Sequence, residues 1–121
     1  MKTVFLSFLA LLLLAVGTVY ARDAAEEGEI RHLIAAVETL EGAQFLRNGS
    51  AYDAKAAADH LRLKLRAAGD RVKTVDDFIR LCGSQSSLSG ERYRIRLADG
   101  TIIEAEVFFR NRLKTFAPGK P

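Results

Sequence analysis

The chain has 121 residues, a formal net charge of +3 and one cysteine, Cys82. A chain of this length buries enough surface for one modest core and no second domain. The small positive charge does not make nucleic acid or an anionic membrane a required partner. With one cysteine no disulfide can form within the chain, and Cys82 falls on the apolar face of an expected helix, where its thiol should be buried and unreactive.

Residues 1–21 have the layout of a secretory signal peptide. Lys2 precedes an apolar run over residues 4–16, and small residues flank a cut after Ala21. The alternative is a retained membrane anchor, because residues 4–21 are about long enough to cross a bilayer. A stop-transfer flank usually carries several basic residues, and their absence before and after this site favours cleavage. We therefore expect export, removal of residues 1–21 and no stable membrane anchor after cleavage.

Three amphipathic helices follow, because apolar residues recur at helical spacing. The expected helices cover residues 26–41, from Ser50 or Asp53 to Ala68, and from Thr74 to Gly83. Either Ser50 or Asp53 can cap the second helix, and Thr74 with Asp77 makes a capping box at the third. Asn48-Gly49 predicts a turn between the first two helices, because both residues tolerate positive φ.

A strand period replaces the helical period at residues 92–97, where apolar residues alternate with an outward row of arginines. The expected elements here are a serine-rich connection over 84–90, a β-hairpin turning at Asp99-Gly100, a helix over 104–116 and a disordered tail over 118–121. A two-residue turn sets Leu97 opposite Ile102. The second strand should then stop near Ile103, because Glu104 would otherwise face inward.

The order of elements predicts one small α+β domain over residues 22–117. Three N-terminal helices, a β-hairpin and a C-terminal helix make up this domain, with the helices covering one face of the sheet. The signal peptide precedes it. No internal repeat is present in the sequence.

His60 and Lys64 are polar residues at unusual positions of the second expected helix. They fall between apolar groups and lie four residues apart on one face, so both should be half buried. A buried ammonium group is costly without acceptors, so Lys64 should either reach the rim of the domain or bind carbonyls or a carboxylate. The pair either ties this helix to a loop or lies at the edge of a recognition cleft.

An ordered set of short motifs resembles a known family. The motifs are Phe45-Leu46-Arg47-Asn48-Gly49, His60-Leu61-x-x-Lys64, Asp77-Phe78-Ile79 and Ser86-Ser87-x-Ser89-Gly90-x-x-Tyr93. In this order and spacing behind a signal peptide they resemble the small exported bacterial family typified by YfeK, over residues 30–113. That family has no established activity, so the resemblance implies a periplasmic location and supplies no mechanism.

The resemblance directs attention to polar residues in loops and at half-buried positions. The candidate binding residues are Arg47, Asn48, His60, Lys64, Ser86, Ser87, Ser89, Gly90 and Tyr93. Arg47 and Asn48 either bind an anion or hold the following helix. The serine loop either presents hydroxyls and amides to a ligand or serves as turn and cap. Tyr93 is expected to be a core aromatic residue whose hydroxyl reaches a partner.

The sequence favours binding over catalysis. A serine hydrolase needs a nucleophile held against a base, and His60 with Ser86, Ser87 or Ser89 offers two such parts, but no Gly-x-Ser-x-Gly motif is present. Metal-ligand spacings are also missing, and no cofactor is expected. We expect a non-enzymatic periplasmic binding or interaction module for an envelope protein or a cell-wall component. The alternatives are a small hydrolase that uses His60 with a serine of residues 84–90, and a purely structural role for these residues.

Overall fold

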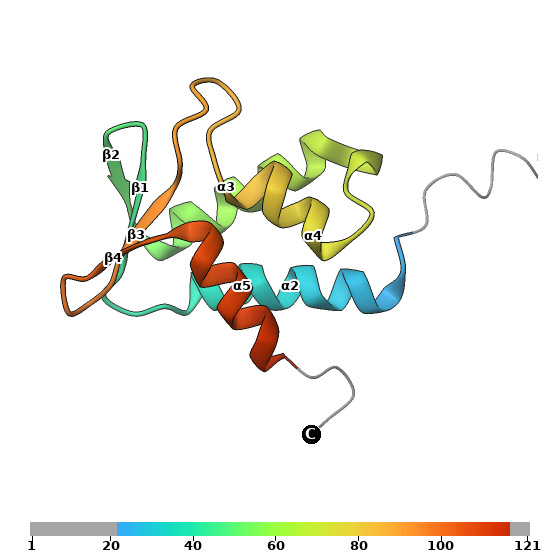
Figure 1. The fold of residues 1–121 in the computed structure, drawn as a ribbon, viewed down its shortest axis with the longest axis horizontal. Coiled ribbons are helices and arrows are strands. Elements are labelled where there is room, and N and C mark those ends of the chain that lie inside the picture. Colours follow the sequence, from blue (N-terminus) through green and yellow to red (C-terminus); the bar gives the residue numbers. More distant parts are fainter. Residues whose placement is uncertain (1–21, 117–121) are drawn as a thin grey trace, which may run out of the picture.

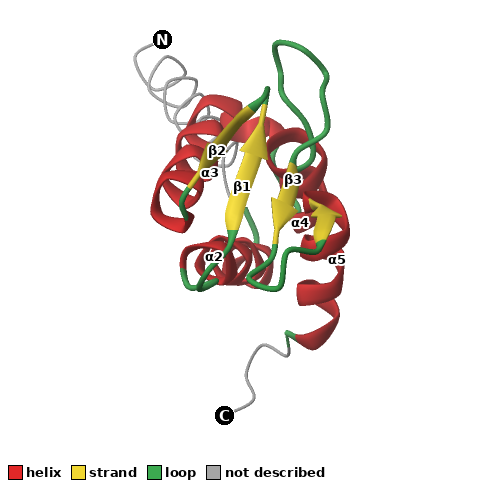
Figure 2. Ribbon diagram, turned by 90° about the vertical axis from the view of Figure 1, so that its left-hand side faces the viewer, coloured by secondary structure: helices red, strands yellow, loops and turns green. Residues whose placement is uncertain are grey.

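The computed structural model describes residues 22–116 and has two layers, a four-stranded antiparallel sheet and a layer of helices on one of its faces (Figures 1 and 2). The strand order is β2-β1-β3-β4. This arrangement confirms the predicted α+β class. The signal peptide predicted over residues 1–21 and the disordered tail predicted over residues 118–121 lie outside the described residues.

Helix α2, Ala24–Glu38, begins the described fold. The Asp23 side chain caps it by accepting a hydrogen bond from the Ala25 amide at 2.7 Å. Ile30, Leu33 and Val37 are fully buried and form the helix face that packs on the rest of the domain. The helix ends three residues before the predicted end at Glu41, because the chain leaves the helical path at Thr39 and turns towards the first strand.

A β-hairpin follows α2, and the sequence predicted its turn but not its strands. Strands β1, Gln44–Arg47, and β2, Ser50–Tyr52, pair across Asn48-Gly49. Both turn residues have positive φ, 48° and 80°, as a tight two-residue hairpin turn requires. Because Ser50 lies in β2, it does not cap the next helix. Asp53 does so, accepting from the Ala56 amide at 2.8 Å at the start of α3.

Helix α3, Ala54–Ala68, leads through a short 3₁₀ turn to α4, Val75–Phe78. Thr74 and Asp77 form the predicted capping box at the start of α4. The helix then widens into a π-helical turn over Ile79–Gly83. The predicted third helix is therefore present, but its second half has wider hydrogen bonding than an α-helix.

The second hairpin has a register that the sequence prediction missed by one residue. Strands β3, Arg94–Arg96, and β4, Ile102–Glu104, pair with Ile95 opposite Ile103. The loop holds three residues because Leu97 pairs with Thr101, and Gly100 takes a φ of 90° at its end. The predicted pairing of Leu97 with Ile102 is therefore wrong. Glu104 faces outward opposite Arg94, so β4 continues to Glu104.

Helix α5, Ala105–Thr115, confirms the predicted last helix and completes the core. On the sheet, Phe45 and Ile95 are cross-strand neighbours that face the helices. The largest fully buried side chains are Phe78, Phe109, Ile30, Leu33, Ile79, Ile95, Val37, Val72 and Cys82. The core therefore joins α2, the π-helical turn, the sheet and α5. Among residues 22–116, no helix combines the length and the apolar character that a membrane-spanning segment needs.

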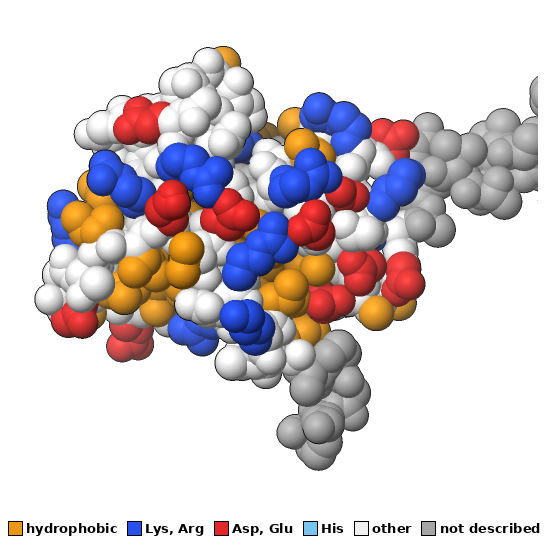
Figure 3. Space-filling view, in the orientation of Figure 1, with side chains coloured by type: hydrophobic (Ala, Val, Ile, Leu, Met, Phe, Trp, Pro, Cys, Tyr) orange, Lys and Arg blue, Asp and Glu red, His pale blue; other side chains and the backbone are white. Residues whose placement is uncertain are grey.

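Acidic and basic side chains alternate across the face that carries α4 and α5 (Figure 3). Arg110 joins the two helices by binding Asp76 at 2.7 Å and Glu106 at 3.5 Å. The connected ion pairs run, in order, through Glu104, Arg92, Glu106, Arg110, Asp76, Arg80 and Asp77. Most charges on this face therefore have a neighbour of opposite sign.

A substitution at Gly83 tests the packing of the π-helical turn on α5. A Cβ atom at Gly83 would lie 2.7 Å from the ring of Phe109, which is only 2% exposed, so the ring or the backbone would have to shift. We expect Gly83→Ala to lower the free energy of unfolding by about 1–3 kcal/mol, measured by urea denaturation. Gly28→Ala is the control, since Gly28 lies inside α2 with no atom within 4 Å of the added Cβ. It should raise stability by about 0.5–1 kcal/mol. Equal effects of the two substitutions would contradict the close contact.

Candidate functional site

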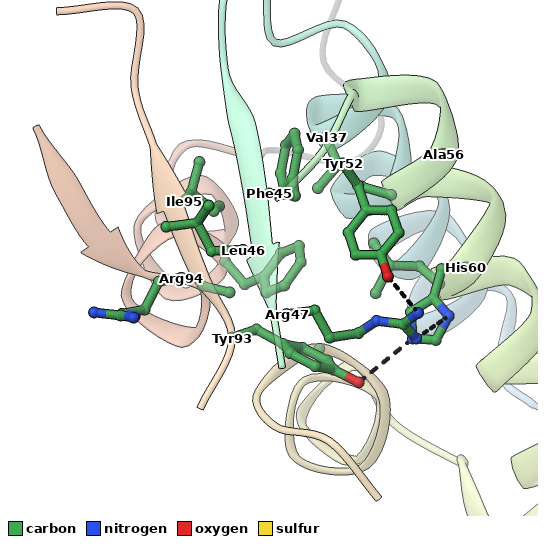
Figure 4. A pocket seen from close by; sticks show the side chains of 15 residues that line it. Val37, Phe45, Leu46, Arg47, Tyr52, Ala56, His60, Tyr93, Arg94 and Ile95 are labelled. Atoms are coloured by element: carbon green, nitrogen blue, oxygen red, sulfur yellow. Dashed lines mark hydrogen bonds between the residues drawn. The ribbon is translucent and has the colours of Figure 1, made fainter. Parts of the chain in front are cut away.

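A cavity of about 190 Å³ lies between the inner face of the sheet and helix α3 (Figure 4). Apolar side chains make most of its wall, among them Phe45, Leu61 and Ile95. The polar side chains that gather at one end of it are Arg47, Tyr52, His60 and Tyr93. We call these four residues, together with Lys64, the polar cluster. Among the described residues that line the cavity, none is acidic.

Arg47 is half buried at the end of β1, and neutral side chains bind its guanidinium group. Its Nη2 donates to the Tyr52 hydroxyl at 3.1 Å, and its Nη1 lies 3.0 Å from Nδ1 and 2.9 Å from Nε2 of His60. A neutral imidazole has one acceptor nitrogen, so one of these two contacts is a hydrogen bond at a time. The hydrogen bond from Arg47 lowers the pKa of Tyr52. No carboxylate within residues 22–116 bonds to Arg47.

His60 is half buried on α3 and lies between two cations. Burial lowers the pKa of the imidazole below its usual value of 6.5, and the positive charges of Arg47 and Lys64 lower it further. The ring is therefore neutral at neutral pH and can accept a hydrogen bond from Arg47. The same two cations make His60 a weak base.

Lys64 binds a carbonyl, as one of the two sequence alternatives predicted. Its Nζ donates to the Gln85 carbonyl at 3.0 Å and to the Tyr93 hydroxyl at 3.0 Å. Tyr93 is buried, and its hydroxyl also lies 3.4 Å from Nε2 of His60. Lys64 and His60 thus tie α3 to the segment that precedes β3. Both side chains are half buried, as predicted.

Asn48 links the first hairpin to the serine loop, residues 84–90. Its Nδ2 donates to Ser86 Oγ at 3.2 Å, and Ser89 Oγ donates to Asn48 Oδ1 at 2.7 Å. Ser86 Oγ also accepts from the amides of Leu88 and Ser89 at 3.2 and 3.3 Å. The two serine hydroxyls therefore fold the loop and dock it on the β1–β2 turn, beside which the loop projects (Figure 2).

The other two predicted site residues of this loop, Ser87 and Gly90, are exposed. Gly90 has a φ of 74° and donates its amide to the Ser86 carbonyl at 2.9 Å, so it shapes the turn. The Ser87 side chain makes no hydrogen bond to another part of residues 22–116. Leu88, which the sequence analysis did not select, is 97% exposed at the loop tip.

The structure joins the candidate residues into two adjacent groups. Arg47, His60, Lys64 and Tyr93 belong to the polar cluster, and Asn48, Ser86 and Ser89 form the loop latch. Sequence reasoning missed Tyr52. Its signal was its position three residues after the Asn48-Gly49 turn, which sets it opposite Phe45 if that turn closes a hairpin.

Within the described residues, the cluster does not pair a serine hydroxyl with His60, as a serine hydrolase would require. A serine nucleophile needs a base within hydrogen-bond reach and a group that orients this base. His60 instead contacts Arg47 and Tyr93, while the hydroxyls of Ser86 and Ser89 contact Asn48. Within residues 22–116, no three metal-binding side chains lie close enough together to hold an ion.

The chain belongs to DUF5329, a family of unknown function, whose pattern matches residues 24–117. It is 37% identical over 71 residues to the uncharacterized protein YfeK of Salmonella typhimurium, and the match covers 59% of each protein. This result confirms the resemblance that the four motifs predicted. No solved structure matches the chain.

The lowered pKa of His60 predicts a specific loss of stability in weak acid. Between pH 7.5 and 5.5 the unfolded chain takes up a proton at His60 near its ordinary pKa of 6.5, while the folded protein resists it. The free energy of unfolding should therefore fall as the pH falls, by at most about 1.4 kcal/mol per pH unit, and screening of this half-buried ring reduces that figure.

His60→Gln is the control for this effect, because the glutamine amide oxygen can still accept a hydrogen bond from Arg47 but does not titrate. Urea denaturation at both pH values should show a smaller decrease in the variant than in the wild-type protein. Equal decreases would show that His60 is readily protonated in the folded state.

Two substitutions at Asn48 separate the effect of its side-chain hydrogen bonds from the effect of its positive φ. Asn48→Gly keeps the positive φ and loses the contacts to Ser86 and Ser89, so amides 88–91 should exchange hydrogen faster than in the wild-type protein. Asn48→Ala loses the same contacts and should be about 1 kcal/mol less stable than the glycine variant. Hydrogen exchange and urea denaturation measure the two effects. Unchanged exchange in both variants would contradict the latch.

Proposed function

We propose that the protein is a non-enzymatic binding module exported to the bacterial periplasm. In this proposal, the cavity takes up an apolar group of an envelope protein or a cell-wall component. The observation that carries the proposal is the cavity itself. An apolar hollow with a few fixed polar groups at one end is the usual form of a binding site. The bonded neighbours of Arg47, His60 and Tyr93 hold these polar groups in place.

The alternative, a small hydrolase that uses His60 with a serine of residues 84–90, has less support. Its base would have to take a proton between two cations, Arg47 and Lys64, which oppose a third positive charge. If its nucleophile were Ser86 or Ser89, that hydroxyl would first have to leave the contacts that fold the serine loop. The exposed Ser87 has no such contacts, but it makes no hydrogen bond to His60. Binding needs no such rearrangement.

The start of the described fold is compatible with export and cleavage after Ala21. Arg22 donates to the Val72 carbonyl and to Glu27, each at 2.7 Å, and Asp23 caps α2. These contacts use residues that follow the predicted cut. Removal of residues 1–21 would therefore leave them in place.

Photo-crosslinking in living cells tests binding at the cavity. A photoreactive amino acid at Leu88 would replace an exposed side chain of the serine loop, which the loop latch joins to the turn that follows Arg47, and a bound partner should give a defined adduct. Ala56 lines the cavity, so Ala56→Leu should fill part of it and reduce the adduct by roughly tenfold. A loss of this size equals about 1.4 kcal/mol, which is near the value of one buried aliphatic side chain.

Ala67→Leu is the matched control, because Ala67 is exposed on the same helix and does not line the cavity. The adduct should persist in this variant. The same adduct in both variants, or no adduct in the unsubstituted cavity, would contradict the proposal. Recovery of the mature protein in the osmotic-shock fraction, with Arg22 as its first residue, tests the export.

A further inference from the structure

The size of the cavity limits the apolar group that it can hold. An engineered protein cavity of about 150 Å³ holds one benzene molecule, and the cavity beside α3 measures about 190 Å³. It therefore has room for one aromatic ring or one branched alkyl group. The apolar wall, which includes Phe45 and Ile95, favours a group without polar atoms at the far end.

The cation at the near end of the cavity, Arg47, forms no ion pair within residues 22–116, and neither does the neighbouring Lys64. Arg47 and Lys64 both carry a positive charge, and their bonded neighbours within residues 22–116 are His60, two tyrosines and a carbonyl. The face with α4 and α5 differs, because its arginines bind carboxylates. A half-buried guanidinium group without an anion is costly, and a bound anion would offset that cost.

The guanidinium group of Arg47 also has hydrogen-bond donors to spare. It carries five N–H groups, of which Tyr52 and His60 each take one. Its Nε makes no hydrogen bond within residues 22–116. The one side-chain atom of these residues that is buried without a partner is Nε2 of His32, so the unbonded Nε of Arg47 is not fully buried. Two adjacent N–H groups of an arginine match the two oxygens of a carboxylate.

We propose that the cavity binds an apolar carboxylate, with the apolar group in the cavity and the carboxylate on the free N–H groups of Arg47. This inference rests on the proposed binding function and adds the chemistry of the ligand. Two sources share this chemistry: a small organic acid with one ring or branched chain, and the C-terminal residue of a polypeptide with an apolar side chain. In both, the carboxylate is joined to the apolar group by a few bonds, which matches the proximity of Arg47 to Phe45 (Figure 4).

A pair of probes with the same apolar group, one a carboxylate and the other a neutral amide, tests this proposal. Calorimetric titration of the mature protein at pH 7.5 compares 3-phenylpropionate with 3-phenylpropionamide, which has the same ring and the same length. The acid should bind roughly tenfold more tightly or better, as expected for hydrogen bonds to a charged group. Equal or tighter binding of the amide would overturn the carboxylate proposal and leave the proposed binding function standing.

Two variants assign the preference to Arg47. Arg47→Gln should abolish the preference for the acid, and Arg66→Gln should keep it, because Arg66 is an exposed cation of α3 that does not line the cavity. An unchanged preference in Arg47→Gln would overturn the assignment. If that variant fails to fold, the comparison of the two probes on the wild-type protein still decides whether a carboxylate is recognised.

A peptide that ends in phenylalanine separates the two sources. It is compared with the same peptide amidated at its C-terminus and with 3-phenylpropionate. Tighter binding of the free-acid peptide than of both others would assign the site to a polypeptide C-terminus. Tighter binding of 3-phenylpropionate would assign it to a small acid. If neither acid binds, the carboxylate proposal is wrong, and the crosslinking at Leu88 decides the proposed function separately.

Discussion

A guanidinium group on the inner face of a sheet needs partners other than bulk water, and Arg47 obtains them from Tyr52 and His60. These contacts hold the first hairpin against α3. They depend on a neutral imidazole, because a protonated His60 would offer Arg47 no acceptor and would add a third charge beside Lys64. Protonation of His60 would therefore remove one of the two side chains that bind Arg47. The polar end of the cavity lies where these side chains meet, and most of the remaining wall is apolar.

The helices were predictable because their signals are local. Apolar periodicity located α2, α3, α4 and α5, and the capping box of Thr74 with Asp77 fixed the start of α4, whereas Asp53 was one of two candidate caps for α3. The first hairpin was missed because Arg47 and Ser50 occupy inner positions where a strand usually carries apolar residues. The register of the second hairpin was wrong because Asp-Gly suits both a two-residue and a three-residue loop. Choosing between them requires the cross-strand partners, which the sequence does not show.

The candidate site likewise has features that local sequence signals predicted and contacts that they could not predict. Helical geometry alone placed His60 and Lys64 between apolar groups, and the cost of burying an ammonium group predicted that Lys64 would bind acceptors. The sequence could not name the Gln85 carbonyl or the Tyr93 hydroxyl as those acceptors, because they come from a segment more than twenty residues away. Tyr52 was missed for a related reason, since its role depends on the hairpin that was not predicted. Contacts between distant segments therefore limit what periodicity can show.

The polar cluster stabilises the fold and also keeps a hydrogen-bond donor of Arg47 available for a ligand. Its contacts join the sheet, α3 and the serine loop, so part of its contribution is to the fold. Stability alone does not require a cation there, because apolar residues of similar size often replace buried charges without loss. Nε of Arg47 makes no hydrogen bond to any described residue, and it lies beside a hollow that no described side chain fills. A purely structural role would leave both features unexplained, whereas an anionic ligand with an apolar group would account for the two together.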